Sequence, residues 1–511
     1  MTPTFGWSLD YAGRRRASVV LPIVLLTMAF AATGVQAAGY DPATDTNSMA
    51  STTAYTGAQA WWAAGYTGDG IDVALIDSGV APINGLRTPG KVVNGPDLSL
   101  ESQAPNLTNL DTFGHGTFMA GLIAGRDDAM TAPYADAPAS AYRGMAPDAR
   151  IISLKVATAD GGADVSQVIA AIDWVVQHRH DNGMNIRVLN LSYGTNSTQW
   201  FGVDPLSYAV EQAWDAGIVV VAAAGNSGYQ AKGSSPALAN PAFDKRIIAV
   251  GSSDSMGTAS IGDDTIPDFS ATTKTGNARR PDFVAPGAHI QGLRVPNSYI
   301  DSHSSQLDDR FLRGSGTSES TAITSGAVAL ILDKYPNATP DQVKRLLMIT
   351  AYDLPAGRVA SMGSGELSLG SMLSTPLPIY AQTIAPSRGG GSLEEARGSD
   401  HLTRDGVILR GELDIFGKTF NSEAMALLEG AGLAWSGGVW NGSSWSGNSW
   451  SGNSWSGNSW SGNSWSGNSW SGNSWSGNSW SGNSWSGSSW SGNSWSGSSW
   501  SGNSWSTAGW N

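Results

Sequence analysis

The stretch Ile71-Asp-Val-Ala-Leu-Ile76, followed by Asp77-Ser-Gly79, is the part of the sequence that most strongly indicates the fold. It is a short run of β-branched and aliphatic residues, which is typical of a buried strand. Asp77 stands at the carboxyl end of that strand, where Ser-Gly turns the chain away. Sites in open α/β sheets lie outside the carboxyl ends of the strands. The stretch therefore predicts a sheet with Asp77 at its functional edge.

Predicted strands and helices alternate along the next 280 or so residues of the chain. We expect further strands at 150–156, 187–193, 218–224, 246–251 and 282–285. We expect helices at 115–125, near 165–180, near 205–216, from Ser318 onward, and after the start signal Thr339-Pro340-Asp341. Alternation of this kind predicts an α/β fold, with a mostly parallel central sheet and helices on both faces.

A second motif, Gly114-His115-Gly116-Thr117, precedes the apolar run Phe118-Met-Ala-Gly-Leu-Ile-Ala124. It predicts a tight turn into a helix that carries the imidazole in its first turn. A third motif, Ala224-Gly225-Asn226, ends the predicted strand at 218–224 and offers a side-chain amide there.

The fourth motif, Gly316-Thr317-Ser318, opens an apolar helix that includes Ser325-Gly-Ala-Val-Ala-Leu-Ile-Leu332. A hydroxyl at the start of a helix gains from free backbone N–H groups and from the positive end of the helix dipole. The N–H of Ser318 could then bind an oxyanion together with the Asn226 amide.

These four motifs supply the groups that acyl-bond hydrolysis needs. A serine hydroxyl needs a base to take its proton, and the base needs a third group to fix its tautomer. Asp77, His115 and Ser318 fit those roles, and Asn226 fits an oxyanion donor. Each motif alone is a weak signal, because a strand-end aspartate or a glycine-flanked histidine is often only structural. The order of the four motifs, each on a suitable element, is specific.

At this point the chain resembles the subtilisin-like serine proteases (subtilases), over about residues 55 to 375. Three further stretches carry the resemblance: Gly144-Met-Ala-Pro147, Leu189-Asn-Leu-Ser192-Tyr-Gly194 and Pro281-Asp-Phe-Val-Ala-Pro-Gly287. The resemblance implies the subtilisin-like three-layer fold and an Asp-His-Ser order of the triad. It implies that Asp77 orients, His115 is the general base, Ser318 is the nucleophile and Asn226 binds the oxyanion. It also implies that Ser192 and Gly194 pair with an extended substrate peptide.

The chain departs from the family pattern beside the nucleophile. The motif continues Glu319-Ser-Thr-Ala322, where the family usually has Ala at 320 and Pro at 322. Glu319 adds a negative charge that could tune the site, and Ser320 is a second hydroxyl nearby. Phe118 replaces a histidine common in relatives, at a position that is not catalytic in the family. The short distance from the predicted signal to the first catalytic strand leaves little room for the family's usual propeptide.

Residues 1–37 are predicted to be a signal peptide. Arg14-Arg-Arg16 forms the charged region, an apolar run covers residues 19–30, and Val35-Gln-Ala37 has the small-residue pattern for cleavage. An uncleaved anchor helix is the alternative, but the apolar run is short for a membrane span and contains Pro22. We therefore expect a peptidase domain at 38–375 that is secreted or at the cell surface, with no membrane contact after cleavage.

Composition restricts the partners and cofactors. The chain has no cysteine, so its stability outside the cell cannot depend on disulfides. Its formal charge of −13 argues against nucleic acid as a partner. The hydrolytic chemistry requires no cofactor. Structural calcium is open, because the acidic pairs could supply oxygen ligands, although solvated loop charges are the commoner interpretation. These pairs are Asp127-Asp128, Asp263-Asp264 and Asp308-Asp309.

The C-terminal part divides by composition into a linker at 376–400, a small accessory segment at 401–434 and a repeat tail at 435–511. From Trp435 to Trp510 tryptophan occupies every fifth position, mostly in the unit Trp-Ser-Gly-Asn-Ser. This period matches neither a helix nor a strand. Three interpretations stay open: a disordered spacer, an adhesive segment that contacts cell wall or glycan, and a self-stacked solenoid. Repeats of this kind resemble tails of some secreted actinobacterial subtilases. The accessory segment is too short for its own core.

The sequence thus predicts a secreted serine endopeptidase that cuts protein or peptide substrates through an acyl-enzyme intermediate. The competing hypothesis is a weakly active or inactive protease-like scaffold that binds a surface or polymer through its tryptophan-rich tail. An esterase or a transpeptidase that uses the same triad is a further alternative.

Overall fold

The computed structural model describes residues 39–104, 106–228, 238–272, 279–354, 359–399, 401–404, 407–444 and 499–501. The predicted signal peptide and most of the predicted repeat tail lie outside the described residues. The described residues from Tyr40 onward belong to one compact unit. Among the described helices, none is both long and apolar enough to cross a membrane.

The centre of this unit is a seven-stranded sheet in the order β2-β3-β1-β4-β5-β6-β7, and all its pairings are parallel. The strands are β1 (Asp72–Asp77), β2 (Val92–Asn94), β3 (Arg150–Lys155), β4 (Ile186–Leu191), β5 (Val219–Ala223), β6 (Ile248–Ser253) and β7 (Phe283–Pro286). Strands β1 and β5 are buried at every position, because helices cover both faces of a parallel sheet. The predicted α/β fold with a mostly parallel sheet is confirmed.

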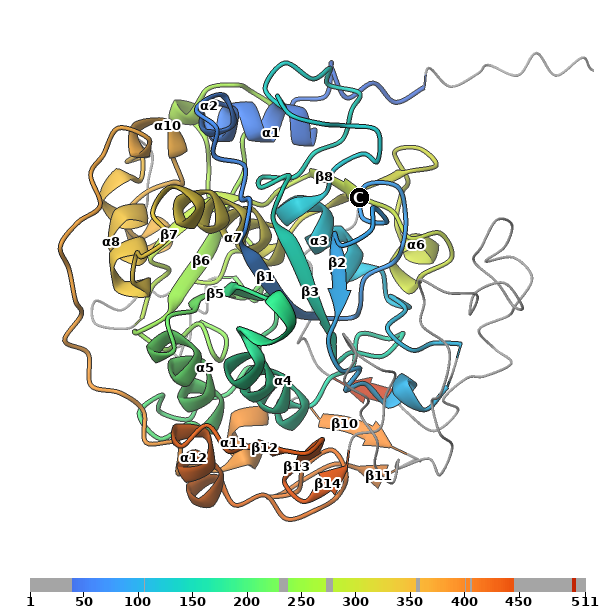
Figure 1. Ribbon diagram of the computed structural model, residues 1–511, viewed down its shortest axis with the longest axis vertical. Coiled ribbons are helices and arrows are strands. Elements are labelled where there is room, and N and C mark those ends of the chain that lie inside the picture. The colour runs from blue at the N-terminus through green and yellow to red at the C-terminus, as the bar shows by residue number, and fades with distance from the viewer. Residues whose placement is uncertain are drawn as a thin grey trace, which may run out of the picture. The chain divides into compact units, whose positions relative to one another are not determined.

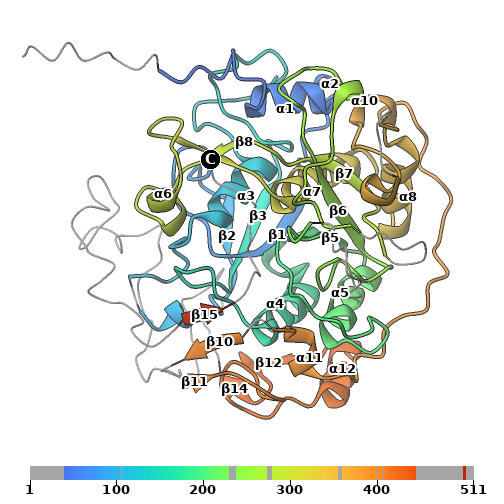
Figure 2. The same cartoon turned by 180° about the vertical axis from the view of Figure 1, so that it is seen from behind.

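Helices α3 (His115–Ala124) and α7 (Thr317–Lys334) pack together on one face of the sheet, and α7 contacts β4, β5, β6 and β7. On the other face α4 (Val165–His178) packs against α5 (Pro205–Asp215) (Figures 1 and 2). Helix α7 is buried from Thr317 to Leu332, which explains why this stretch is apolar or small on all sides apart from Glu319.

The helix start signals in the sequence behave as expected. Helix α8 (Pro340–Thr350) begins after Thr339, whose hydroxyl accepts a hydrogen bond from the N–H of Gln342. Helix α4 begins after Asp164, which forms a capping box with Gln167 that sequence reasoning did not select. Strand β2 at the sheet edge was not predicted, since Val92-Val-Asn94 is short and only half-buried.

Short elements complete the protease-like part. They are α1 (Met49–Tyr55), α2 (Ala58–Ala63), β8 (Ile290–Leu293), α6 (Tyr299–His303), β9 (Phe311–Gly314), α9 (Val359–Met362) and α10 (Leu369–Met372). Strands β8 and β9 form an antiparallel pair beside α3.

The segment after residue 375 is attached to α4 and α5 (Figures 1 and 2). It contains α11 (Leu393–Arg397), β10 (His401–Arg404), β11 (Val407–Ile408) and α12 (Ser422–Gly430). Strand β11 is only two residues long. Arg397 is wholly buried and forms an ion pair with Asp164, with Nε and Oδ2 2.6 Å apart. The predicted linker thus contributes a buried contact to the start of α4.

The first ten residues of the predicted tail form a small antiparallel sheet of β12 (Trp435–Ser436), β13 (Val439–Trp440) and β14 (Ser443–Ser444). Its two turns, Gly437-Gly438 and Asn441-Gly442, have positive φ at both residues, as tight hairpin turns require. Trp435 and Trp440 lie directly opposite each other across the first hairpin.

Both tryptophans of this small sheet are buried against α4. The indole N–H of Trp435 donates to the carbonyl of Ala170 at 2.8 Å, and that of Trp440 donates to Oδ2 of Asp173 at 2.7 Å. Their exposed fractions are 5% and 0%. The start of the tail is therefore packed as firmly as the domain interior.

Candidate active site

The structure brings Asp77 and His115 into contact at the carboxyl edge of the sheet. Asp77 is the last residue of β1, and His115 is the first residue of α3. Nδ1 of His115 lies 2.9 Å from each carboxylate oxygen of Asp77. Both side chains are buried. With Nδ1 held by the carboxylate, the imidazole has a fixed orientation and Nε2 is the nitrogen left for proton transfer.

Glycine at position 116 allows this contact. A Cβ there would lie 2.1 Å from the carbonyl oxygen of Gly79 and 3.1 Å from Oδ1 of Asp77. Helix α3 could not approach the end of β1 so closely with any larger residue. The Gly-His-Gly pattern is therefore explained by packing around the histidine.

Asp111 fixes the start of α3 from the preceding loop, although sequence reasoning did not select it. Its carboxylate accepts hydrogen bonds from the N–H of Gly114 at 2.6 Å, the N–H of Thr117 at 2.7 Å and Oγ of Ser78 at 2.8 Å. It thereby joins the turn after β1 to the first turn of the helix. The capping rule could not have identified it, because it applies to the residue directly before a helix, and Asp111 stands four residues before His115.

Charges around His115 favour its protonated form. Burial is the largest single influence on the pKa of His115 and lowers it, whereas the charge of Asp77 and its hydrogen bond raise it. Glu319 and Asp111 raise it further, and the pKa is above its ordinary value. The imidazole therefore binds a proton well, as a general base must do while it draws one from a hydroxyl.

Ser318 occupies the second position of α7, the helix that packs on α3. Its Oγ donates to the carbonyl oxygen of Ser192 at 3.3 Å, and Oγ of Ser192 donates to the carbonyl oxygen of Ser318 at 3.1 Å. These two contacts hold the start of α7 against the end of β4. Ser320, the alternative hydroxyl, donates instead to the carbonyl oxygen of Ala285 in β7 at 2.9 Å.

Asn226 follows β5 and is oriented by Thr317. Its Oδ1 accepts from the N–H of Thr317 at 2.8 Å and from Oγ1 of Thr317 at 3.0 Å. Since an N–H can only donate, the oxygen of the amide must face Thr317. The Nδ2 group therefore faces away from Thr317 and is available as a donor. Thr317 itself stands one residue before the predicted nucleophile, Ser318. Thr317 is a second positioning residue that sequence reasoning did not select.

Gly194 lies three residues beyond β4, next to a backbone pair between Thr195 and Asn240. A Cβ at Gly194 would lie 2.6 Å from the Cβ of Ala239, so a side chain there would push that segment away. Ser192, the other predicted substrate-binding residue, has its carbonyl oxygen bound by the Ser318 hydroxyl.

The acidic pairs considered for calcium are engaged with protein groups. Asp127 and Asp128 form ion pairs with Arg310 and Arg87, in both cases with 2.5 Å between nitrogen and oxygen. In the described part of the chain, no three His, Cys, Asp or Glu side chains are grouped as a metal site would need. Structural calcium stays a prediction.

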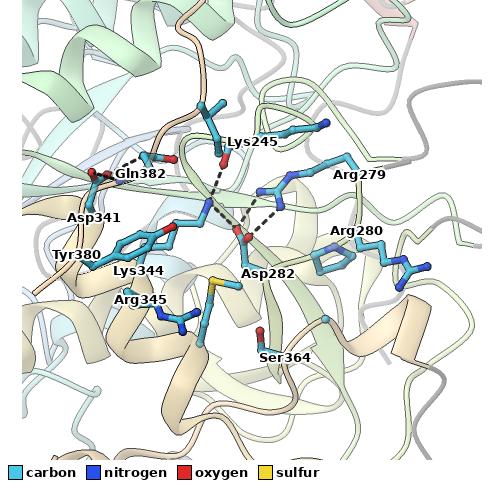
Figure 3. Close-up of a pocket in the computed structure, with 14 residues that line it drawn as sticks. Lys245, Arg279, Arg280, Asp282, Asp341, Lys344, Arg345, Ser364, Tyr380 and Gln382 are labelled. Carbon is cyan, nitrogen blue, oxygen red and sulfur yellow. Dashed lines mark hydrogen bonds and ion pairs between the residues drawn. The ribbon is translucent and has the colours of Figure 1, made fainter. Parts of the chain in front are cut away.

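A cavity of about 520 Å³ lies elsewhere, between the start of β7 and α8 (Figure 3). Figure 3 shows Arg279 and Lys344 directed at Asp282, whose carboxylate lies 2.8 Å from the guanidinium and 3.3 Å from the amine. Two cations of this cavity thus share one carboxylate. None of the predicted catalytic residues lines it.

Comparisons with known proteins agree with this geometry. Residues 68–369 match the model of the Subtilase family. Serine protease AprX of Bacillus subtilis is 38% identical over 287 residues, which are 55% of this chain and 61% of that protein. Subtilisin DY of Bacillus licheniformis is 33% identical over 297 residues, which are 57% of this chain and 87% of that protein.

A crystal structure of a cold-adapted subtilisin-like serine proteinase is also similar, at 26% identity and a TM-score of 0.43. The match covers 59% of this chain and 90% of that one. The family model spans more than half of the chain, from the segment before β1 to the start of α10. This chain therefore belongs to the subtilase family.

Proposed function

We propose that this chain is a serine endopeptidase that hydrolyses protein or peptide substrates, with Asp77, His115 and Ser318 as its triad. The observation that carries the proposal is the buried contact of His115 with both oxygens of Asp77, at 2.9 Å each. The packing of α3 against α7, which begins at Thr317, supports the role of Ser318.

In the proposed reaction, the Ser318 hydroxyl transfers its hydrogen bond from the Ser192 carbonyl to Nε2 of His115 as substrate binds. His115 accepts the proton while Oγ attacks the peptide carbonyl, and Asp77 stabilises the imidazolium that forms. The amide of Asn226 and the N–H of Ser318 stabilise the oxyanion. His115 then protonates the leaving amine, and water hydrolyses the acyl-enzyme.

Labelling with a fluorophosphonate, which reacts with activated serines, tests this proposal. We expect the wild type to be labelled and the Ser318→Ala variant not to be. Ser320→Ala is the matched control, because its hydroxyl is engaged with the Ala285 carbonyl, and it should label like the wild type. A folded wild type that does not label, or a Ser318→Ala variant that does, would overturn the assignment. Comparing peptide with ester substrates then separates a peptidase from an esterase.

We also propose export of the chain, on the basis of the predicted signal at residues 1–37. Mass spectrometry of the protein from the medium should show Ala38 as the first residue. Recovery of the chain only in the cell, with residues 1–37 retained, would contradict this.

A further inference from the structure

Glu319 is a buried carboxyl that the proposed mechanism leaves without a role. It follows Ser318 in α7, its exposed fraction is 0%, and its N–H belongs to the first turn of the helix. Neither carboxyl oxygen forms a hydrogen bond with another described residue. A buried carboxylate with no donor beyond its own backbone N–H is costly, so its surroundings must either keep it protonated or balance its charge.

The charged groups near Glu319 are those of the catalytic pair. The elements that pack against α7 are α3, β1, β4, β5, β6 and β7, and the last three contain no ionisable side chain. His115 lies on α3, and Asp77 ends β1. Both are close enough for their charges to act on the Glu319 carboxyl.

The remaining ionisable groups on these elements are engaged elsewhere. Asp72, at the opposite end of β1, is bound by Arg150 at 2.6 Å. Arg187 of β4 donates to the carbonyl oxygens of Pro336, Ala338 and Gly217. Asp111 acts on His115 from the loop before α3. Among the described charges on the packed elements, those of His115 and Asp77 are thus the ones that act on the Glu319 carboxyl.

The two titrations are therefore linked. Burial raises the pKa of Glu319 to about 8, the charge of His115 lowers it, and that of Asp77 raises it. Conversely, an ionised Glu319 raises the pKa of His115. One proton can sit on either group, as imidazolium with carboxylate or as neutral imidazole with carboxylic acid. Only the second arrangement leaves His115 able to accept the Ser318 proton.

We propose that Glu319 is a positioning residue for the general base, and that its carboxyl shares a proton with His115 and thereby moves the working range of the enzyme to higher pH. The inference rests on the proposed function, because it assigns His115 as the base. Glu319 touches no reacting atom; it acts through the imidazole.

The test is the pH profile of kcat/KM on a peptide substrate for the full-length wild type and for Glu319→Gln, which has the same shape without a charge. We expect the acidic limb of the variant to lie about half a pH unit or more below that of the wild type, as removal of a nearby buried charge predicts. Glu319→Asp, which keeps the carboxyl, should restore a limb close to that of the wild type. A purely structural role would scale activity equally at every pH and leave the limb in place.

Coincident limbs for the wild type and Glu319→Gln would overturn the inference. If neither protein hydrolyses peptides or labels with the fluorophosphonate, the proposed function itself fails, which is a distinct result. Should Glu319→Gln not fold, Glu319→Met provides an uncharged side chain of similar length. In addition, the Nδ1 proton resonance of His115 in the wild type should titrate in two steps, and a single step would also contradict the shared proton.

Discussion

Asp77 and Asp173 are two buried aspartates that bind a ring nitrogen in very different regions of the molecule. Asp77 accepts from Nδ1 of His115 and from the N–H of Ser78 at 2.7 Å, at the functional edge of the sheet. Asp173 accepts from the indole of Trp440, where the start of the tail covers α4. An imidazole can take a second proton and an indole cannot. The first pair can therefore move charge, whereas the second can only hold two segments together.

Burial is the dominant influence on the pKa of Asp173. It raises the pKa of this carboxyl to about 8, and the single hydrogen bond from Trp440 only partly lowers it. Glu429 of α12, which is buried nearby, has its pKa raised by burial and by the charge of Asp173. The carboxyls of Asp173 and Glu429 therefore hold a proton more tightly than exposed carboxyls do. The comparison predicts that changes in the first region affect activity and that changes in the second affect stability.

The largest effect is expected from Asp77→Asn. The amide would bind the wrong tautomer of His115, and kcat should fall by about 10⁴, the loss found for this change in another serine protease. The folded state should persist. Steady-state kinetics on a peptide substrate measure the loss of kcat. Asp173→Asn is the matched aspartate-to-asparagine change in the other region. Equal losses of kcat in the two variants would contradict the prediction that only the Asp77 region affects activity.

Trp440→Ala should lower the free energy of unfolding by about 3–5 kcal/mol, because it removes a fully buried indole and leaves Asp173 without a donor. The midpoint of chemical unfolding measures the loss. Trp200→Ala, at a side chain that is 66% exposed, is the control and should change little. Activity per folded Trp440→Ala molecule should match the wild type. If Trp440→Ala and Trp200→Ala unfolded at the same denaturant concentration, the tail would not be part of the folded unit.

Asn226→Ala should reduce kcat by about 10² to 10³, the range measured for the oxyanion asparagine of a subtilisin, with little change in KM. Asn337→Ala, at an exposed position, is the control. A loss confined to KM would mean that the amide binds the ground state and not the oxyanion.

The smallest effect on activity is expected from Asp173→Asn, which should change the pH dependence of stability instead. Because the folded-state pKa of Asp173 lies above the unfolded value, its contribution to stability is complete below about pH 4. It is lost as pH rises through about 8. The wild type should therefore lose more stability than Asp173→Asn between pH 5 and 8. Unfolding midpoints across that range test the slope, and parallel curves would show that Asp173 is not protonated in the fold.

Much of the fold could be predicted because its signals are local. The apolar run before Asp77 and the run at 218–224 became β1 and β5 within one or two residues. The cap at Thr339 begins α8, since capping depends on neighbouring backbone groups alone. The same holds for the placement of Asp77 at a strand end and of His115 and Ser318 at helix starts.

Other features could not be predicted because they depend on distant segments. The burial of Glu319 follows from the packing of α7 into the centre of the sheet, and nothing near it in sequence indicates whether its carboxyl meets water or His115. The support that Asp111 gives to α3 depends on the turn after β1.

The tryptophan repeat shows most clearly the difference between what local sequence determines and what distant packing decides. By itself, the sequence determined a tryptophan at every fifth position, a spacing that fits no helix or strand. The tertiary structure decided what that spacing does at residues 435–444, where two-residue turns place Trp435 opposite Trp440 and α4 buries both indoles. The physical reason is that periodicity records only the relation of a segment to its own backbone, whereas burial depends on the surface against which the segment packs.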